Sequence, residues 1–187
     1  MNYYKVSIDM NIENDIVCHY NNDYGIEQNT MVSGKHFNDW DGRMEFYFNK
    51  EEGSVWTDYL ANDKGWFLVS NKLKEILETL DTDIEFFEVN IREGGTSSYE
   101  MYYIANIVRV VDALCLEISD YFETKIEGFD TIYTVSKYGI YKDKVEASDI
   151  FKLGNGQEIP LFCSEKFKQL VEDNNLTGLA FTKIKSM

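Results

Sequence analysis

Apolar and polar residues alternate in several short stretches of the chain, as they do in strands that bury one face. The first stretch covers residues 3–12, where Tyr4, Val6, Ile8 and Met10 occupy alternate positions. Further short runs, either alternating or largely apolar, predict strands at residues 16–18, 44–48, 84–91, 102–108, 131–135 and 179–184. The chain is therefore expected to be rich in β-structure.

Two segments have the spacing of an amphipathic helix. Each follows a serine, Ser70 or Ser164, whose hydroxyl can accept a hydrogen bond from a free backbone N–H of the first turn. The apolar positions at helical spacing are Leu73, Ile76, Leu77 and Leu80 in the first segment, and Phe167, Leu170 and Val171 in the second. Since a short apolar run precedes each helix and a predicted strand follows it, the second half of the chain contains two similar strand–helix–strand units.

These elements predict an α+β fold, in which a few short helices pack on one mixed β-sheet. The chain has 187 residues, which suits one domain. Residues 1–55 are expected to form a strand-rich acidic region packed on the main domain, residues 56–187, because about 55 residues make a marginal core alone. Turns are expected at Gly94-Gly95 and Gly154-Asn155-Gly156, and residues 110–122 are ambiguous between helix and extended structure.

The chain is strongly acidic. It has 33 Asp and Glu residues against 18 Lys and Arg residues, which gives a net charge of −15. Sequence-independent binding to nucleic-acid phosphates needs a basic surface, so this charge argues against a nucleic-acid partner. No apolar run approaches the roughly 20 residues that span a bilayer, and the N-terminus has no apolar signal core. The expected location is the cytoplasm, with no membrane partner.

Candidate chemistry is sparse in the sequence. It contains no glycine-rich phosphate loop, and His19 and His36 are not spaced as a metal-binding pair. Cys18 and His19 cannot form a thiolate–imidazole dyad, because adjacent residues of a strand point to opposite faces. The other cysteines, Cys115 and Cys163, lie far apart and form no paired-cysteine motif, which favours a reducing compartment. No catalytic residue, metal or cofactor is therefore expected.

The first third of the chain combines acidic and aromatic side chains. Residues 3–65 contain 12 acids and five bases, together with Trp40 and Trp56. Aromatic side chains ringed by acids suit docking onto a basic partner. The predicted partner-binding residues are Asp39, Trp40, Asp41, Glu51, Glu52, Trp56 and Asp58. A solvated surface is the simpler explanation for the acids.

Five sequence features follow one another over roughly residues 55–187. They are Trp66-Phe67-Leu68-Val69-Ser70 with its helix, Glu85-Phe86-Phe87-Glu88-Val89, Tyr102-Tyr103-Ile104-Ala105-Asn106-Ile107 leading to Val111-Asp112-Ala113-Leu114, Asp149-Ile150-Phe151-Lys152-Leu153, and Cys163-Ser164-Glu165 with Leu176-Thr177-Gly178-Leu179-Ala180-Phe181. In their order and spacing the chain resembles a bacterial immunity-protein family of polymorphic toxin systems, long catalogued as a domain of unknown function. It departs from the family pattern at Cys115, where an Asp is common, and at Lys152, where an Arg is common.

The resemblance implies a cytoplasmic, non-enzymatic protein that neutralises a cognate toxin domain by binding it, with no catalytic residues to carry over. The acidic charge favours a basic toxin, such as a nuclease, because complementary fields speed association. Two other hypotheses remain open. One is a small-molecule-binding or enzymatic α+β domain with an aromatic pocket, which a carboxyl group of raised pKa in a deep cleft would favour. The other is a structural subunit of a larger assembly.

Overall fold

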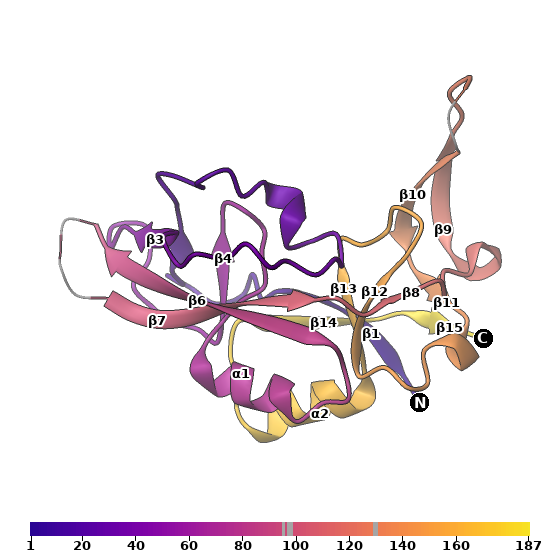
Figure 1. Cartoon of the computed structure of the whole chain (residues 1–187). Helices are drawn as coiled ribbons and strands as arrows, with labels where there is room; N and C mark the ends of the chain where they lie inside the picture. The colour runs from indigo at the N-terminus through magenta and orange to yellow at the C-terminus, as the bar shows by residue number, and fades with distance from the viewer. Residues whose placement is uncertain (95, 97–98, 129–130) are drawn as a thin grey trace.

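The computed structural model describes residues 1–94, 96, 99–128 and 131–187. Among these residues the strands form a six-stranded sheet, a five-stranded sheet and two small two-stranded sheets, with two short α-helices (Figure 1). The α+β class is confirmed, but the strands divide between two main sheets instead of joining one. The predicted turn at Gly154–Gly156 is present, whereas Gly95 of the other predicted turn lies outside the described residues.

The six-stranded sheet has the order β2-β4-β5-β7-β6-β3. Its long hairpin of β6 and β7 pairs Ile84 with Ile107 at one end and Arg92 with Tyr99 at the other. The strands span β2 (Val17–Cys18), β3 (Glu45–Phe48), β4 (Tyr59–Asn62), β5 (Leu68–Val69), β6 (Ile84–Glu93) and β7 (Tyr99–Ile107). Each strand predicted in this part of the chain is present, and β4 is an addition that the sequence did not predict.

The five-stranded sheet has the order β14-β1-β13-β12-β8. Its strands span β1 (Tyr3–Ile8), β8 (Val110–Val111), β12 (Ile150–Leu153), β13 (Leu161–Ser164) and β14 (Leu179–Lys183). The N-terminal strand β1 lies inside this sheet, because Tyr4 pairs with Cys163 on one side and with Lys183 on the other. Residues from the two ends of the chain therefore build one sheet.

The two main sheets repeat one topology. In each, two parallel strands flank an antiparallel central strand, which is β7 between β5 and β6 in one sheet and β1 between β13 and β14 in the other. The next strand outward, β4 or β12, is antiparallel to its neighbour, and the edge strand, β2 or β8, is parallel to that one. The predicted strand–helix–strand units are thus confirmed, and each is part of a five-stranded motif. The central strand of the motif is the last of the five along the chain in one copy, β7, and the first in the other, β1.

The two helices, α1 (Asn71–Glu78) and α2 (Glu165–Asp173), begin at the predicted serine caps. The Ser70 hydroxyl accepts a hydrogen bond of 3.1 Å from the Leu73 N–H, and the Ser164 hydroxyl accepts one of 3.4 Å from the Phe167 N–H. Each cap satisfies a backbone donor that the first helical turn leaves free. The helices lie side by side on one face of the molecule (Figure 1).

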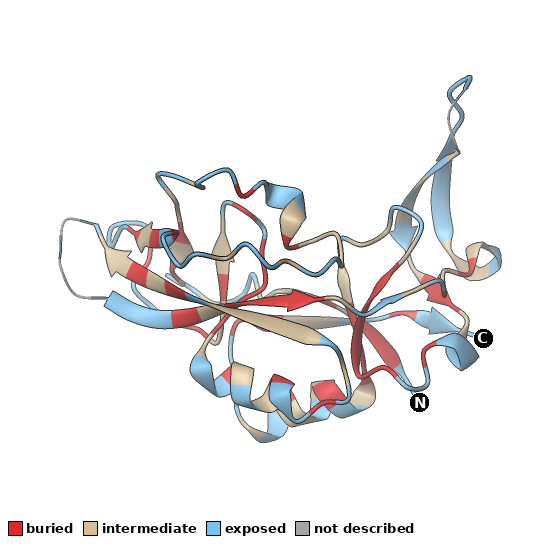
Figure 2. Cartoon of the chain, in the orientation of Figure 1, coloured by how far each residue is buried: buried red, intermediate tan, exposed pale blue. Residues whose placement is uncertain are grey.

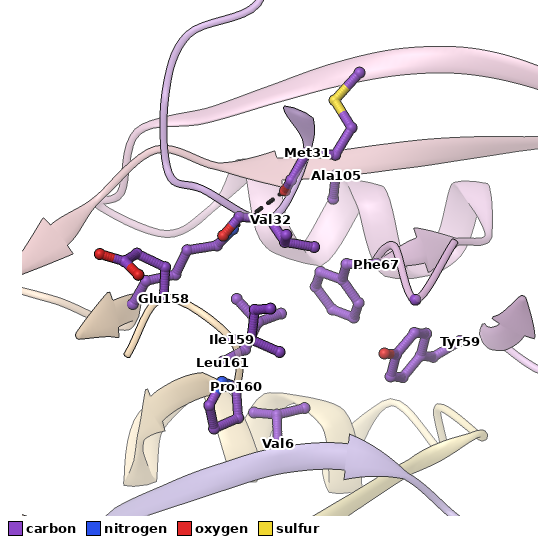
Figure 3. A pocket seen from close by; sticks show the side chains of 12 residues that line it. Val6, Met31, Val32, Tyr59, Phe67, Ala105, Glu158, Ile159, Pro160 and Leu161 are labelled. Carbon is purple, nitrogen blue, oxygen red and sulfur yellow. Dashed lines mark hydrogen bonds between the residues drawn. The ribbon is translucent and has the colours of Figure 1, made fainter. Parts of the chain in front are cut away.

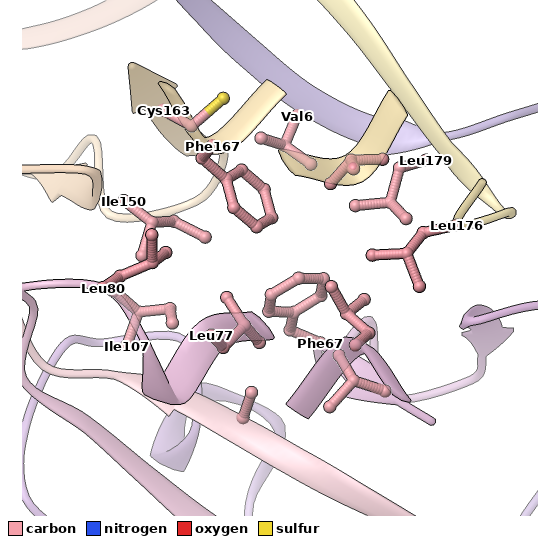
Figure 4. Packing of buried hydrophobic residues seen from close by; sticks show 14 of the residues in the cluster. Val6, Phe67, Leu77, Leu80, Ile107, Ile150, Cys163, Phe167, Leu176 and Leu179 are labelled. Carbon is pink, nitrogen blue, oxygen red and sulfur yellow. The ribbon is translucent and has the colours of Figure 1, made fainter. Parts of the chain in front are cut away.

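A shared hydrophobic core joins the two units beneath the helices. Phe67 just before β5, Leu77 of α1 and Phe167 of α2 point into one cluster of buried side chains (Figure 4). Leu176 and Leu179, which follow α2, close the same cluster. Because both units contribute to one core, they are expected to unfold together.

A second core lies on the opposite face of the six-stranded sheet. The segment between β1 and β3 runs over this face (Figure 1). Trp66 is fully buried there, and its indole N–H donates a hydrogen bond of 2.9 Å to the Gln28 carbonyl. Two buried lysines hold the same segment: Lys64 donates to the Ile26 carbonyl at 2.8 Å, and Lys152 donates to the Val32 carbonyl at 2.7 Å. The N-terminal segment is therefore bonded to both sheets.

Residues 110–122, ambiguous in the sequence, contain no α-helix. They form β8, a 3-10 turn at Leu116–Ile118 and the start of β9 (Asp120–Thr124). Strand β9 pairs with β10 (Ile132–Lys137) in a hairpin that projects from the body of the molecule (Figure 1). The remaining short elements are β11 (Gly139–Ile140) paired with β15 (Lys185–Ser186), and 3-10 turns at Gln28–Thr30 and Lys142–Lys144.

Candidate functional site

The seven predicted partner-binding residues lie between β2 and the start of β4. Asp39, Asp41, Glu51 and Glu52 are exposed. Trp40 and Asp58 are half-buried, and Trp56 is 37% exposed. The structure places Glu52 beside His19, Asp39 and Asp41 on either side of Trp40, and Asp58 at a helix cap, while Trp56 lies in an aromatic cluster and Glu51 in the turn after β3.

His19 lies between two carboxylates. Its Nε2 atom is 2.8 Å from Glu52 Oε2, and its Nδ1 atom is 3.0 Å from Asp63 Oδ2. The hydrogen bond with Glu52 raises the pKa of His19, and Asp63 adds to this effect against the opposing influence of burial. Because the two acids lie at opposite nitrogens of the ring, they favour a charged imidazolium rather than a shared metal ion. Cys18 is fully buried on the other face, as the strand alternation predicts.

Trp56 packs on an aromatic platform at one end of the six-stranded sheet. Its ring stacks on Tyr102 at 5.6 Å between centroids and meets the edge of Phe48 at 5.1 Å. Tyr99 and Lys50 line a shallow hollow of about 190 Å³ beside it. The exposed part of Trp56 is therefore fixed in orientation, which suits an anchor for a partner.

Trp40 and Asp41 are also held in place. The Trp40 ring lies 5.4 Å from the ring of Phe87 on β6. Asp41 pairs with Arg43, whose Nε donates to it at 2.6 Å, and this hydrogen bond holds the pKa of the Asp41 carboxyl below its usual value. The charge of Asp41 is thus neutralised by Arg43, while the nearby Asp39 is exposed.

Asp58 occupies a structural position. One carboxylate oxygen accepts a hydrogen bond of 2.6 Å from the Ser70 hydroxyl, and the other accepts bonds of 2.8 and 3.2 Å from the Thr177 N–H and hydroxyl. In the second unit, the Ser164 hydroxyl likewise donates to Asp149 at 2.9 Å. Both carboxylate oxygens of Asp58 therefore accept hydrogen bonds from within the molecule.

A further polar cluster, which the sequence did not indicate, lies on β6. The Glu85 carboxylate accepts hydrogen bonds from His36 at 2.8 Å, from the Phe37 N–H at 3.0 Å and from Asn106 at 2.9 Å. Burial alone would raise the pKa of Glu85, but these hydrogen bonds outweigh it and lower the pKa. A carboxylate held in this way anchors the segment around residue 36 and is not an acid ready to donate a proton.

A cavity of about 150 Å³ lies where the two sheets meet, lined by Val6, Phe67, Leu161 and other apolar side chains (Figure 3). This volume is below the roughly 300–1,000 Å³ of typical ligand pockets. Burial lowers the pKa of Lys152 at its edge to about 8 and raises the pKa of Tyr59 to about 12. The Lys152 ammonium donates to the Met31 and Val32 carbonyls, so it serves as an anchor for the N-terminal segment.

A larger hollow, of about 550 Å³, opens between Tyr24 and the ends of β3 and β6. Its two arginines are paired with acids, Arg43 with Asp41 and Arg92 with Glu45, which Arg92 Nε contacts at 3.0 Å. The hollow is polar and charge-balanced. Its lining includes Arg43, Glu45, Arg92 and Glu93, whereas small-molecule sites are lined mostly by apolar side chains.

The three cysteines lie inside the structure. All three are free and buried. Burial raises the pKa of Cys18 to about 12 and also raises the pKa of Cys163. In the described part of the chain no group of three His, Cys, Asp or Glu side chains is placed to hold a metal ion.

Several exposed apolar side chains lie on the projecting hairpin. Phe122 on β9 is 75% exposed, and Ile132 on β10 is 52% exposed. The alternation between residues 120 and 124 is too short to predict strand β9. Most of this strand also falls in residues 110–122, which the sequence left open between helix and extended structure. The only available signal was the run Asp120-Tyr121-Phe122, in which two aromatics follow a charged residue.

The fold and its polar groups define a class of protein. It is an α+β protein of two related sheets, in which His19, Glu85 and Lys152 are hydrogen-bonded to neighbouring side chains or to the backbone. Among the described helices, none is long and apolar enough to cross a membrane. The chain belongs to the immunity protein family Imm11, whose sequence model matches residues 2–186. The match includes residues 2–54, which the resemblance in sequence had left outside. No curated protein matches the chain.

Proposed function

We propose that the chain neutralises a protein toxin by binding to it directly, without chemistry of its own. The observation that carries this proposal is the immunity-family match over residues 2–186. The polar clusters support it, because His19, Glu85 and Lys152 are all bound within the fold. The proposal places the chain in the cytoplasm, where its three free cysteines would stay reduced.

We further propose that the toxin is a basic protein, such as a nuclease. The net charge of −15 would attract a positively charged partner over distances up to about one Debye length, roughly 10 Å at 0.1 M salt. Asp39, Asp41, Glu51 and Glu52 are exposed and are the acids assigned to this field, although Asp41 is paired with Arg43 and Glu52 with His19. Trp40, Trp56 and Asp58 complete the predicted surface, with Trp56 as the residue best placed to touch a partner.

The proposal is tested by the growth of bacteria that express a toxin domain encoded next to the gene of this chain. Co-expression of this chain should restore growth, and the two proteins should elute together in size-exclusion chromatography. Growth rescue without a complex would contradict neutralisation by binding. If the toxin domain still kills in the presence of well-expressed chain, the cognate pairing itself fails.

The alternative of a small-molecule site or an enzyme would need a deep aromatic cleft with a carboxyl of raised pKa. Wherever a carboxyl pKa is shifted among the described residues, it is lowered by hydrogen bonds or ion pairs. The cavity of about 150 Å³ between the two sheets is also small, and the Lys152 ammonium at its edge already donates to the Val32 carbonyl. These observations favour the binding function.

A further inference from the structure

The projecting hairpin of β9 and β10, called here the arm, stands apart from the cores of the molecule (Figure 1). All five residues of β9 are exposed, and all six residues of β10 are exposed or half-buried (Figure 2). A two-stranded hairpin alone is marginally stable in water. An arm of this kind needs either a firm base or a partner that covers it.

The base of the arm is firm. Asp120 Oδ2 lies 3.0 Å from the Lys137 ammonium, and the other oxygen lies 3.7 Å from Lys185. The Ser136 hydroxyl donates to the Asp120 carbonyl at 3.0 Å, which ties the two strands where they leave the body. The arm is thus presented in a defined direction, which reduces the entropy that a partner must overcome.

One side of the arm faces the body. The Gln157 side chain donates a hydrogen bond of 2.8 Å to the Tyr133 carbonyl of β10. The Tyr121 and Tyr133 rings meet edge to face at 5.5 Å on one face of the hairpin. Strand β10 is therefore the inner strand, and β9 is the outer one with its backbone edge unpaired in the described structure.

The other face of the arm is apolar and open. Phe122 is opposite Thr134, and Thr124 is opposite Ile132, so alternation puts Phe122 and Ile132 on the same face. These two side chains are 75% and 52% exposed, and Ile126 beyond β9 is 48% exposed. An aromatic and two aliphatic side chains next to a free strand edge are the features of a strand-pairing interface.

Charge selects the occupant of this face. Two copies of a chain with net charge −15 repel each other, which disfavours arm-to-arm pairing. The described part of the arm carries three acids, Asp120, Glu123 and Glu127, against Lys125 and Lys137. We propose that the arm docks on a basic toxin domain, with the Phe122–Ile132 face and the free edge of β9 against an apolar patch rimmed by Lys or Arg. This inference rests on the proposed function and adds a second contact surface for the same toxin, separate from the acidic loops near Trp56.

Binding kinetics with the toxin domain encoded beside this chain's gene test the inference. The test variant is Phe122→Ser with Ile132→Thr. The matched control is Met10→Ser, which also removes an exposed apolar side chain, here 87% exposed and in the turn after β1. A second variant replaces residues 121–136 with Asn-Gly and so closes Asp120 onto Lys137, its cross-strand partner.

We expect the double variant and the arm deletion to raise Kd by about ten-fold or more through faster dissociation, and Met10→Ser to leave it unchanged. Wild-type affinity in both arm variants overturns the docking assignment while leaving toxin binding intact. No binding by the wild-type chain overturns the proposed function and the arm assignment together. Sedimentation of the chain alone supplies the last outcome: a dimer that the double variant dissociates means that a second copy, and not the toxin, covers the arm.

Discussion

The Ser70 hydroxyl donates a hydrogen bond of 2.6 Å to Asp58, whose other carboxylate oxygen accepts from Thr177. Asp58 therefore links the helix cap of the first unit to the loop that follows α2 in the second. The corresponding pair in the second unit is Ser164 with Asp149. Matching serine–aspartate pairs at matching helix caps are the local sign of the repeated topology.

Substitution of Asp58 by Ala is expected to lower stability and not only binding. It leaves the Thr177 N–H without its acceptor and frees the Ser70 hydroxyl, so a loss of about 1–3 kcal/mol in the free energy of unfolding is expected. Urea denaturation measures it, with exposed Asp39→Ala as the control. Equal stability of the two variants would show that Asp58 has no structural role.

Stability should depend on pH through His19. Because the hydrogen bond with Glu52 raises the pKa of His19 in the folded state, this contribution is fully present below the unfolded pKa, near 6.5. It is lost as the pH rises through the higher folded value. The free energy of unfolding of the wild type, minus that of Glu52→Gln, should therefore be larger at pH 6 than at pH 8.5.

The matched control for this pH effect is Glu51→Gln, because Glu51 is the exposed neighbour of Glu52. Its difference from the wild type should change little over the same pH range. A larger change for Glu51→Gln than for Glu52→Gln would show that the imidazolium–carboxylate contact is not the cause.

Lys152 is expected to hold the N-terminal segment. Lys152→Met leaves the Met31 and Val32 carbonyls without their buried donor. Amide hydrogen exchange should then become faster between residues 26 and 37, while the α2 amides keep their protection. Lys166→Met is the control, since that side chain is exposed and bonds to Asp149. Unchanged exchange in the N-terminal segment would contradict the anchoring role.

The acidic loops are expected to act on association rather than on dissociation. Replacing Asp39, Asp41, Glu51 and Glu52 by their amides should lower the association rate constant for the toxin domain and flatten its dependence on salt. The dissociation rate should change much less. Stopped-flow mixing at low and moderate salt measures both, and unchanged association rates would remove these loops from the account.

The helices and most strands could be predicted from the sequence, because their signals are local. Ser70 and Ser164 each precede apolar residues at helical spacing, and Glu45–Phe48 alternates over a few positions. The division into two sheets could not be predicted in this way. It depends on pairings such as Tyr4 with Cys163, which join the ends of the chain and leave no local pattern.

The candidate site was harder to predict than the fold. Acids and tryptophans in the first third suggested one surface, but pairing decides which of them are free, and the Asp58 contacts with Ser70 and Thr177 are visible only in three dimensions. Strand β10 of the arm was predicted at residues 131–135, but β9 was not, because Phe122 lies in a short run with no buried face to set a period. The seven residues proposed from the sequence remain a prediction, of which the kinetic experiments test the four exposed acids.

Calorimetric titration of the chain with the purified toxin domain encoded beside it tests the central claim most directly. We expect one-to-one binding at low salt that weakens at moderate salt, as for an acidic protein that binds a basic one. An affinity that does not change with salt would agree with the immunity role but contradict the proposal that charge attracts the toxin. Absence of binding heat at both salts and at two temperatures would contradict neutralisation by direct binding.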